Sequence, residues 1–533
     1  MRIGTGFPIA TAFVAGILAA GMWRPAPATA ADALQAIEAR PGSNDAVVEM
    51  GQLGAPDTSG LGLLTSVESG VPKSMWQGTS RATAEALLQK APAPTRSRAL
   101  QSLGRRVLLT EATAPQGEGS ADSFLALRLR RLIALGDLEA VVRISDELIV
   151  GKETSAEQMA RTDALLLRGA DGDACLMARD MVRFAADIYW TKLDAYCKAR
   201  AGDLSGGEFD LSLIHERDDD PVFFSLYDRL VLPQRDDVQP APFDGSALAF
   251  AFLRAARAVP ETADFATGAP ALLRAVALDA GGTSADVRLT AAVEAAAYGA
   301  FPIDALRALF TLQGFPAEAL ADPAKAAGSM VPARALALFY QAIAQGDSPR
   351  ARVTLTSIAY RYAARHDLGS VVIDLVRPLI GDSSGDSSLS PFAPDMTRAC
   401  LAGGDMDCAD SWFALVGSAP PAGADPIRFA KLQAAMVETP APGDGMVPAA
   451  DPALSDFDAA VAHGAVAEAV LRALDVIGPR TPAQAGDAVI APVAAGLATL
   501  GLGGDARAVL REAALAPPDL TSAVAPPAAD PAP

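Results

Sequence analysis

The four cysteines are the residues whose chemistry this sequence constrains most, because they form two close pairs in a chain of 533 residues. Cys175 and Cys197 are symmetric about Ala186, and Cys400 and Cys408 bracket a glycine in the same way. Two antiparallel helices that turn at such a midpoint travel equal distances from it. Each pair would then lie level, at the Cα separation of about 5.5 Å that a disulfide needs. We therefore expect two disulfides, each closing one helical hairpin.

Two other interpretations of the cysteines stay open at this stage. Four unpaired cysteines would behave as small buried hydrophobic side chains. A metal site is the third interpretation, although the spacing of Cys400 and Cys408 is unlike that of zinc ligands and no histidine is close in sequence.

Two short runs match catalytic or nucleotide-binding patterns but lack the context those patterns need. GDSSG at 381–385 would make Ser383 a nucleophile, yet such an elbow requires a strand before it and a helix straight after it. GLGGDA at 501–506 follows the dinucleotide pattern through Gly501, Gly503 and Ala506, which also needs a preceding strand. We interpret the first run as a loop and the second as a turn between helices.

The remaining polar candidates also favour structural roles. The three histidines, His215, His366 and His463, are far apart, and none has a second histidine at ligand spacing. The aspartates of GDMDCAD (Asp405, Asp407 and Asp410) suggest a cation loop, but the glutamate that closes an EF-hand loop is replaced by Val416. Trp190 and Trp412 lie near cysteines, where we expect them to pack. The sequence thus predicts no catalytic residue, no cofactor and no metal.

Helices must position these residues, since the apolar pattern is helical almost throughout. Leu125, Leu129, Leu132 and Ile133 share one helix face, and Leu336, Phe339, Tyr340 and Ile343 share another. Gly-Asp recurs where one apolar helix gives way to the next, and there we expect glycine to end a helix and aspartate to begin another. These dipeptides stand at 136–137, 172–173, 202–203, 346–347, 404–405 and 504–505.

Two family resemblances follow from these runs. Trp190, Leu193 and Tyr196 resemble part of the W-x2-L-G-x2-Y run of tetratricopeptide repeats, with Asp194 in the glycine position and the tyrosine one residue early. The resemblance implies an all-α superhelical stack of helical hairpins, an α-solenoid, in which each repeat meets only its neighbours. Runs such as SMWQGTSRATAEALL also resemble exported alanine-rich bacterial proteins labelled antifreeze glycopeptide polyprotein, a label that implies no activity.

The N-terminus predicts export. Arg2, an apolar run and Ala28-Thr29-Ala30 follow the order of a secretory signal peptide cleaved after Ala30, although an uncleaved anchor at residues 4–23 stays an alternative. Export would place the cysteines in an oxidising compartment such as the periplasm, where disulfides persist. The formal net charge of −19 disfavours nucleic-acid and anionic-membrane partners.

Composition divides the chain into six segments. We expect a signal peptide (1–30), an irregular lead-in (31–75), a helical-hairpin solenoid (76–436), a Pro/Gly/Ala linker (437–456), C-terminal helices (457–515) that cap the solenoid or stand apart, and a disordered tail (516–533).

Solenoids expose long surfaces and usually bind other proteins or peptides. The sequence therefore favours a non-catalytic periplasmic scaffold or adaptor with a protein or peptide partner. The alternatives are an enzyme of peptidoglycan metabolism and a membrane-anchored accessory protein.

Overall fold

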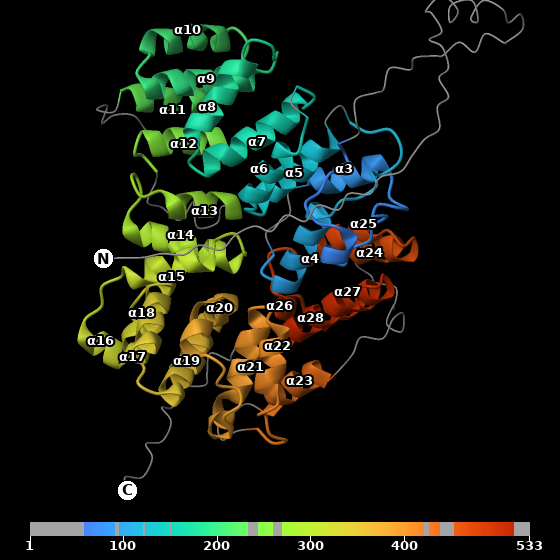
Figure 1. Cartoon of the computed structure of the whole chain (residues 1–533), viewed down its shortest axis with the longest axis vertical. Coiled ribbons are helices and arrows are strands. Elements are labelled where there is room, and N and C mark those ends of the chain that lie inside the picture. The colour runs from blue at the N-terminus through green and yellow to red at the C-terminus, as the bar shows by residue number, and fades with distance from the viewer. Residues whose placement is uncertain are drawn as a thin grey trace, which may run out of the picture. The chain divides into compact units, whose positions relative to one another are not determined.

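Figure 1 shows the computed structural model of the chain, which describes residues 58–90, 95–120, 123–149, 151–232, 243–259, 269–420, 426–437 and 452–515. Within these ranges the regular elements are helices, and β structure is limited to two isolated bridges, Leu64 with Thr110 and Ser80 with Gln116. This confirms the predicted all-α fold of packed helical hairpins. The predicted signal peptide and tail lie outside the described residues, as do residues 31–57 of the lead-in and 438–451 of the linker.

The first described helices form pairs that begin at polar caps. Ser80, Ser97, Ser123 and Thr154 each accept a hydrogen bond from the backbone of the helix that they precede, which satisfies one of its free N–H groups. The helices of this part are α2 (Ser66–Ser69), α3 (Arg81–Gln89), α4 (Arg98–Leu109), α5 (Phe124–Ala134), α6 (Leu138–Asp146) and α7 (Ser155–Leu167).

The next hairpin carries the first disulfide. Cys175 is bonded to Cys197 with a Cα separation of 5.6 Å, and Ala186 lies in the connection between their helices, as the symmetry of the pair predicts. Further helices continue this stack. Its members are α8 (Asp171–Met181), α9 (Ile188–Ala201), α10 (Leu204–His215), α11 (Pro221–Val231) and α12 (Ala247–Ala255).

The middle of the chain continues with hairpins and carries the second disulfide. Cys400 is bonded to Cys408, again with a Cα separation of 5.6 Å, and the chain reverses through Gly404, whose φ is 78°. The elements are α13 (Pro270–Leu278), α14 (Ala285–Ala297), α15 (Ile303–Thr311), α16 (Ala317–Ala321), α17 (Pro323–Ala327), α18 (Pro332–Ala344), α19 (Pro349–Ala364), α20 (Gly369–Ile380), the 3-10 helix η2 (Ser387–Phe392), α21 (Ala393–Ala402) and α22 (Met406–Phe413).

The last helices pack back onto the first ones. They are α23 (Pro426–Val437), α24 (Pro452–Ala462), α25 (Val466–Ile477), α26 (Pro482–Ala485), α27 (Asp487–Thr499) and α28 (Gly503–Ala513). Helix α25 contacts α3 and α4, and α28 contacts α4, as their neighbouring blue and red ribbons in Figure 1 show. The expectation that each repeat meets only its neighbours in sequence is therefore wrong for this chain, because the C-terminal helices dock on the N-terminal ones.

A buried carboxyl group makes one of these long-range contacts. Glu512 of α28 is 4% exposed and lies at the first turn of α4. Its Oε2 accepts a hydrogen bond from the Ser97 hydroxyl at 2.5 Å, and its Oε1 accepts one from the Ala99 backbone N–H at 2.8 Å. A negative group at a helix N-terminus pairs with N–H groups that have no partner within the helix. Glu512 therefore completes a cap whose other half is Ser97.

The Gly-Asp dipeptides end and begin helices at three of their six positions. At 136–137, 202–203 and 404–405 the glycine has a positive φ and the aspartate caps the next helix. At 172–173 and 504–505 both residues lie inside a helix, and Gly169 and Gly501 take the left-handed conformation upstream instead. At 346–347 the cap of the following helix is Ser348. The prediction was wrong at these last three dipeptides, because a glycine upstream ends the preceding helix or a serine downstream caps the following one.

Candidate functional site

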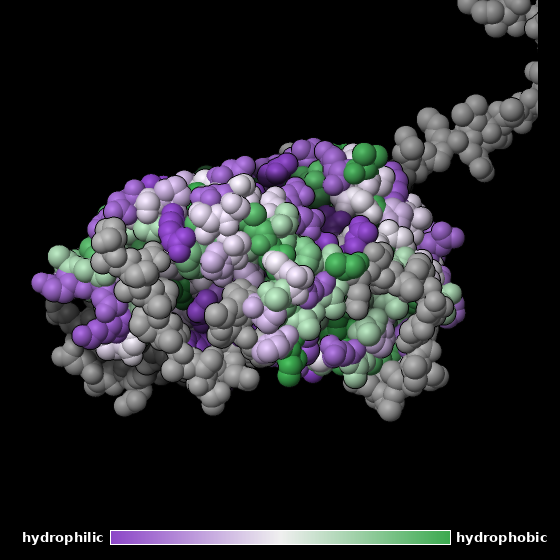
Figure 2. Space-filling view, turned by 90° about the horizontal axis from the view of Figure 1, so that it is seen from below, coloured by the Kyte–Doolittle hydropathy of each residue, from purple (hydrophilic) through white to green (hydrophobic). Residues whose placement is uncertain are grey.

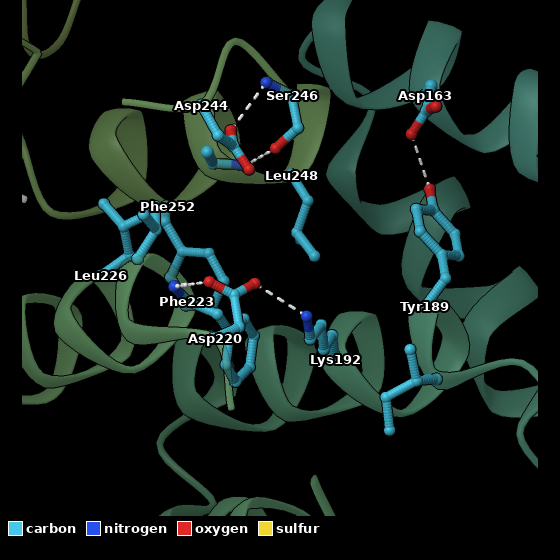
Figure 3. A pocket seen from close by; sticks show the side chains of 13 residues that line it. Asp163, Tyr189, Lys192, Asp220, Phe223, Leu226, Asp244, Ser246, Leu248 and Phe252 are labelled. Carbon is cyan, nitrogen blue, oxygen red and sulfur yellow. Dashed lines mark hydrogen bonds and ion pairs between the residues drawn. The ribbon is translucent and has the colours of Figure 1, made fainter. Parts of the chain in front are cut away.

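A pocket of about 300 Å³ lies between α7, α9, α11 and α12, and it is the candidate functional site (Figure 3). Its inner wall is apolar and aromatic. Phe223, Leu226 and Phe252 are buried there, and the rings of Phe223 and Phe252 meet edge to face at 5.6 Å between centroids. Aromatic pairs in this arrangement stabilise a wall beyond the area they bury. The pocket therefore has a fixed apolar floor.

Asp163 and Tyr189 form the first polar contact of the pocket. The Tyr189 hydroxyl on α9 donates a hydrogen bond to Oδ1 of Asp163 on α7 at 2.7 Å, as Figure 3 shows. Burial raises the pKa of Asp163 to about 6, although the hydrogen bond from Tyr189 and the charge of Arg130 act to lower it. Near neutral pH this carboxyl group is therefore mostly charged, and an additional cation beside it would stabilise that charge.

Lys192 is the only lysine or arginine among the lining residues, and its charge is already compensated. Its Nζ donates to Oδ2 of Asp218 at 2.6 Å and to Oδ2 of Asp220 at 2.7 Å, and it lies 5.5 Å from the centre of the Phe223 ring. Burial opposes the charge on Lys192, but the two hydrogen bonds outweigh it and raise the pKa of this amine. Lys192 thus holds two aspartates in place rather than leaving a free positive charge.

Helix starts position the other two acidic residues of the lining. Asp220 caps α11, where its Oδ1 accepts from the Phe223 backbone N–H at 3.1 Å. Burial disfavours its charge, but the hydrogen bonds from Lys192 and from the helix N–H groups outweigh that effect and lower the pKa of Asp220. Asp244 stands exposed two residues before Ser246, the cap of α12, and accepts from its N–H at 2.8 Å. The mouth of the pocket is therefore acidic above an apolar interior.

Exposed apolar side chains occur on the neighbouring hairpins. Phe184, in the connection between α8 and α9, is 86% exposed, and Phe209 on α10 is 62% exposed. Leu176 on α8 and Leu213 on α10 are exposed as well. On the face of the molecule that Figure 2 shows, the most hydrophobic residues form small groups among hydrophilic ones. A contiguous exposed apolar patch is typical of a surface that meets a partner, whereas single exposed apolar residues are common on protein surfaces.

The residues that matched catalytic patterns do not converge. Ser383 follows a helix rather than a strand, and its hydroxyl donates to the Ile380 carbonyl at 2.5 Å. Gly501 ends α27, and Gly503 and Ala506 lie in α28, so no strand precedes them either. GDSSG is therefore the connection that the sequence indicated, whereas in GLGGDA only residues 501–502 connect two helices and residues 503–506 begin α28.

The histidines have separate structural contacts, and so do Asp405 and Asp410, whereas Asp407 is exposed in the first turn of α22. His215 stacks on Phe224, His366 lies against Tyr362, and the ring of His463 hydrogen-bonds the Ala459 carbonyl. Asp405 caps α22 and pairs with Arg377, whereas Asp410 pairs with Arg511. Within the described ranges no three His, Cys, Asp or Glu side chains gather in a group that could hold a metal ion.

The tryptophans near the cysteines are buried, as expected. Trp190 on α9 is fully buried, and its indole N–H donates to the Ser155 hydroxyl at 3.1 Å. Trp412 is buried on α22, one turn after Cys408. Both aromatic rings therefore belong to the core of the disulfide-bonded hairpins.

Sequence reasoning missed the acidic pocket. The run HERDDDP at 215–221 looks like a polar loop, yet its Asp218 and Asp220 form ion pairs with Lys192. One local signal was available, because Asp220 directly before Pro221 is a common start for a helix.

The two disulfides indicate an oxidising compartment, extracellular or periplasmic. No helix among the described residues combines the length and apolar character that crossing a bilayer requires. Comparison with known proteins adds no relative: no family model, no curated protein and no solved structure matches this chain.

Proposed function

We propose that this protein is a non-catalytic periplasmic adaptor that binds a segment of another protein in the pocket between α7, α9, α11 and α12. The observation that carries the proposal is the composition of that pocket. Its lining contains three aspartates, Asp163, Asp220 and Asp244, and an apolar floor. The one lysine in the lining, Lys192, already forms ion pairs with Asp218 and Asp220. Such a pocket suits a basic side chain with an apolar stem or an apolar neighbour.

Two further features support a protein partner. The exposed phenylalanines Phe184 and Phe209 lie in the connection before α9 and on α10, which packs against α9, and they offer apolar surface to a partner. Stacked helical hairpins usually act by binding proteins or peptides, which fits the proposed resemblance to tetratricopeptide repeats.

Photo-crosslinking in living cells tests the proposal. A benzophenone amino acid at Ser246, which is exposed at the pocket, should capture a protein that the same amino acid at Leu312 does not capture. Leu312 is 79% exposed and lies beyond α15, outside the pocket lining. Mass spectrometry identifies the partner, and equal labelling patterns at the two positions would contradict the assignment of this pocket.

A matched pair of charge reversals then measures the electrostatic contribution. Asp244→Lys should weaken binding of the captured partner about tenfold, because it removes one exposed attraction and adds one repulsion. Glu318→Lys changes the net charge equally on α16, where Glu318 is exposed outside the pocket, and should leave the affinity unchanged. Salt should weaken the wild-type complex, since exposed charges are screened over about 8 Å at physiological ionic strength. Equal affinities for both variants would show that the partner is not recognised by charge here.

A further inference from the structure

The acidic pocket, which is the pocket between α7, α9, α11 and α12, carries more negative charge than its own residues compensate. Its lining contains three aspartates and one lysine, Lys192, so three negative charges and one positive charge give a formal net charge of −2. Two charges behind the lining leave this balance unchanged. Asp218 pairs with Lys192 and adds a negative charge, whereas Arg130 acts on Asp163 and adds a positive one. The acidic pocket is therefore complementary to a ligand with two positive charges.

Two of the three aspartates lie on different walls of the acidic pocket. Asp163 belongs to α7 and Asp244 to the segment before α12, and Figure 3 shows them on opposite sides of the pocket with Leu248 between them. Asp163 accepts a hydrogen bond from the Tyr189 hydroxyl, and Asp244 accepts one from the Ser246 N–H. A carboxylate can accept about four hydrogen bonds, so each of the two has capacity for a ligand ammonium as well.

Asp220 differs from these two aspartates because its charge is already compensated. Its Oδ2 accepts from the Lys192 ammonium at 2.7 Å, and its Oδ1 accepts from the Phe223 N–H at the start of α11 at 3.1 Å. For Asp163, by contrast, burial outweighs both the Tyr189 hydrogen bond and the charge of Arg130, so that its carboxylate is stabilised only in part. Two positive charges brought by a ligand would therefore be bound at Asp163 and Asp244.

The shape of the site favours a linear ligand over a metal ion. Mg²⁺ and Ca²⁺ need several oxygen atoms at about 2.0 to 2.6 Å around one point. In the part of the chain that the structure describes, no three acidic, histidine or cysteine side chains gather in that way. The pocket floor is apolar instead, with Phe223, Leu226, Leu248 and Phe252 in its lining. A chain of methylene groups is stabilised when it leaves water for such a surface.

We propose that the acidic pocket binds two ammonium groups joined by an apolar chain, one ammonium at Asp163 and the other at Asp244. This inference rests on the proposed function, because it assigns the ligand chemistry of the same pocket. Two sources present this chemistry. One is a free alkyl diamine or polyamine, and the other is a protein segment with two lysines close together in sequence.

Calorimetric titration of the full chain with a series of linear alkyl diamines tests the proposal. Each diamine is compared with the monoamine of the same chain length at neutral pH and low salt. The best diamine should bind about tenfold more tightly than its monoamine, because it forms a second charged contact. The affinity should also peak at one chain length, since a shorter chain does not reach both carboxylates and a longer one must bend. Affinities that rise steadily with length and are equal in the two series would show apolar contact alone. That result, or the absence of binding, overturns the proposal.

Matched substitutions locate the two ends of the ligand. Asp163→Asn and Asp244→Asn each remove one charge and keep an oxygen that can accept from Tyr189 or from the Ser246 N–H. In either variant the best diamine should lose its advantage of about tenfold over the matched monoamine, because only one charged contact remains. Asp347→Asn is the control, since Asp347 is exposed between α18 and α19, and this variant should keep the full advantage. An advantage that persists in Asp163→Asn or in Asp244→Asn would overturn the assignment of that residue and with it the proposal.

A displacement experiment distinguishes the two sources. The probe is acetyl-Lys-Ala-Lys amide, added to the complex with the best diamine. Displacement at concentrations similar to those of the diamine indicates a protein segment, whereas its absence indicates a free diamine, and both results support the proposed chemistry. The proposed function fails separately, if diamines bind but no protein is captured at Ser246. Conversely, capture of a protein at Ser246 without binding of any diamine overturns this inference and leaves the proposed function standing.

Discussion

Replacing Glu512 with glutamine should change how the stability of this protein depends on pH. Glu512 brings a nearly fully buried carboxyl group from α28 to the first turn of α4, where Ser97 and Ala99 donate to it. Burial raises the pKa of Glu512 from its ordinary value of 4.5 to about 7, although both hydrogen bonds and the charge of Arg98 act to lower it. The free energy that the carboxylate loses by being dehydrated is therefore larger than the free energy that it gains from the hydrogen bonds at the start of α4.

The sign of the effect follows from this raised pKa. The folded protein holds the Glu512 proton more tightly than the unfolded chain, so folding takes up a proton between the two pKa values. Stability from this group is fully present below about pH 4.5 and is lost as the pH rises through about 7. At about 1.4 kcal/mol per pKa unit, the whole loss amounts to about 3 kcal/mol. Between pH 5 and pH 8, roughly 2 to 3 kcal/mol of it should be observed.

Urea unfolding of the wild type and of Glu512→Gln at several pH values from 5 to 8 measures this contribution. Glutamine can accept from the Ala99 N–H and donate to the Ser97 hydroxyl, and it does not titrate. The wild type should therefore lose about 2 to 3 kcal/mol relative to the variant across this range. Burial also raises the pKa of Asp374 and of Asp505, but both residues are present in the two proteins, so their effects cancel in the difference.

The control is Glu318→Gln, which makes the same chemical change at an exposed position on α16. The difference between this variant and the wild type should stay flat from pH 5 to pH 8. If the Glu512→Gln difference is equally flat, then Glu512 has an ordinary pKa in the folded protein. The account of the contact between α4 and α28 would then be refuted.

Three other predictions concern stability and are measured by chemical denaturation of the oxidised protein. Arg128→Met should cost about 3 to 5 kcal/mol, because the guanidinium of this fully buried arginine donates to four backbone carbonyls; a cost below about 1 kcal/mol would contradict that role. The double variant Cys175→Ala with Cys197→Ala should lose about 3 kcal/mol through the freed loop of the unfolded chain, and unchanged stability would argue against a closed disulfide. Gly496→Ala should cost about 1 to 3 kcal/mol, because the added Cβ would stand 2.6 Å from the Phe457 ring; a stabilised variant would show that the two helices can separate freely.

The parts of the fold that the sequence predicted correctly depend on residues close together along the chain. Helices follow from the apolar period, and the two cysteine pairs follow from equal helix lengths on either side of a turn. Cys175 and Cys197 lie 22 residues apart, and Cys400 and Cys408 lie 8 apart. Over such short separations, chain geometry alone restricts which atoms can meet.

The contacts between distant helices could not be predicted in this way. An apolar helix face shows that the helix packs against something, but it does not identify the partner. Arg106 of α4, for example, pairs with Asp505 of α28, and nothing in either local sequence indicates the other. The candidate pocket was missed for the same reason, because Asp163, Lys192 and Asp220 come from separate elements.

The contact between α28 and α4 also affects the order in which the chain can fold. Ala99 and Glu512 are 413 residues apart in sequence, yet their hydrogen bond helps to complete the first turn of α4. During synthesis the chain emerges N-terminus first, so α4 is made long before its capping residue. Meanwhile the faces of α3 and α4 that pack against α25 and α28 have no partner from their own chain. Contacts of such wide separation slow folding and prolong the exposure of apolar surface. The N-terminal helices of this protein should therefore depend most on assistance while the rest of the chain is being made.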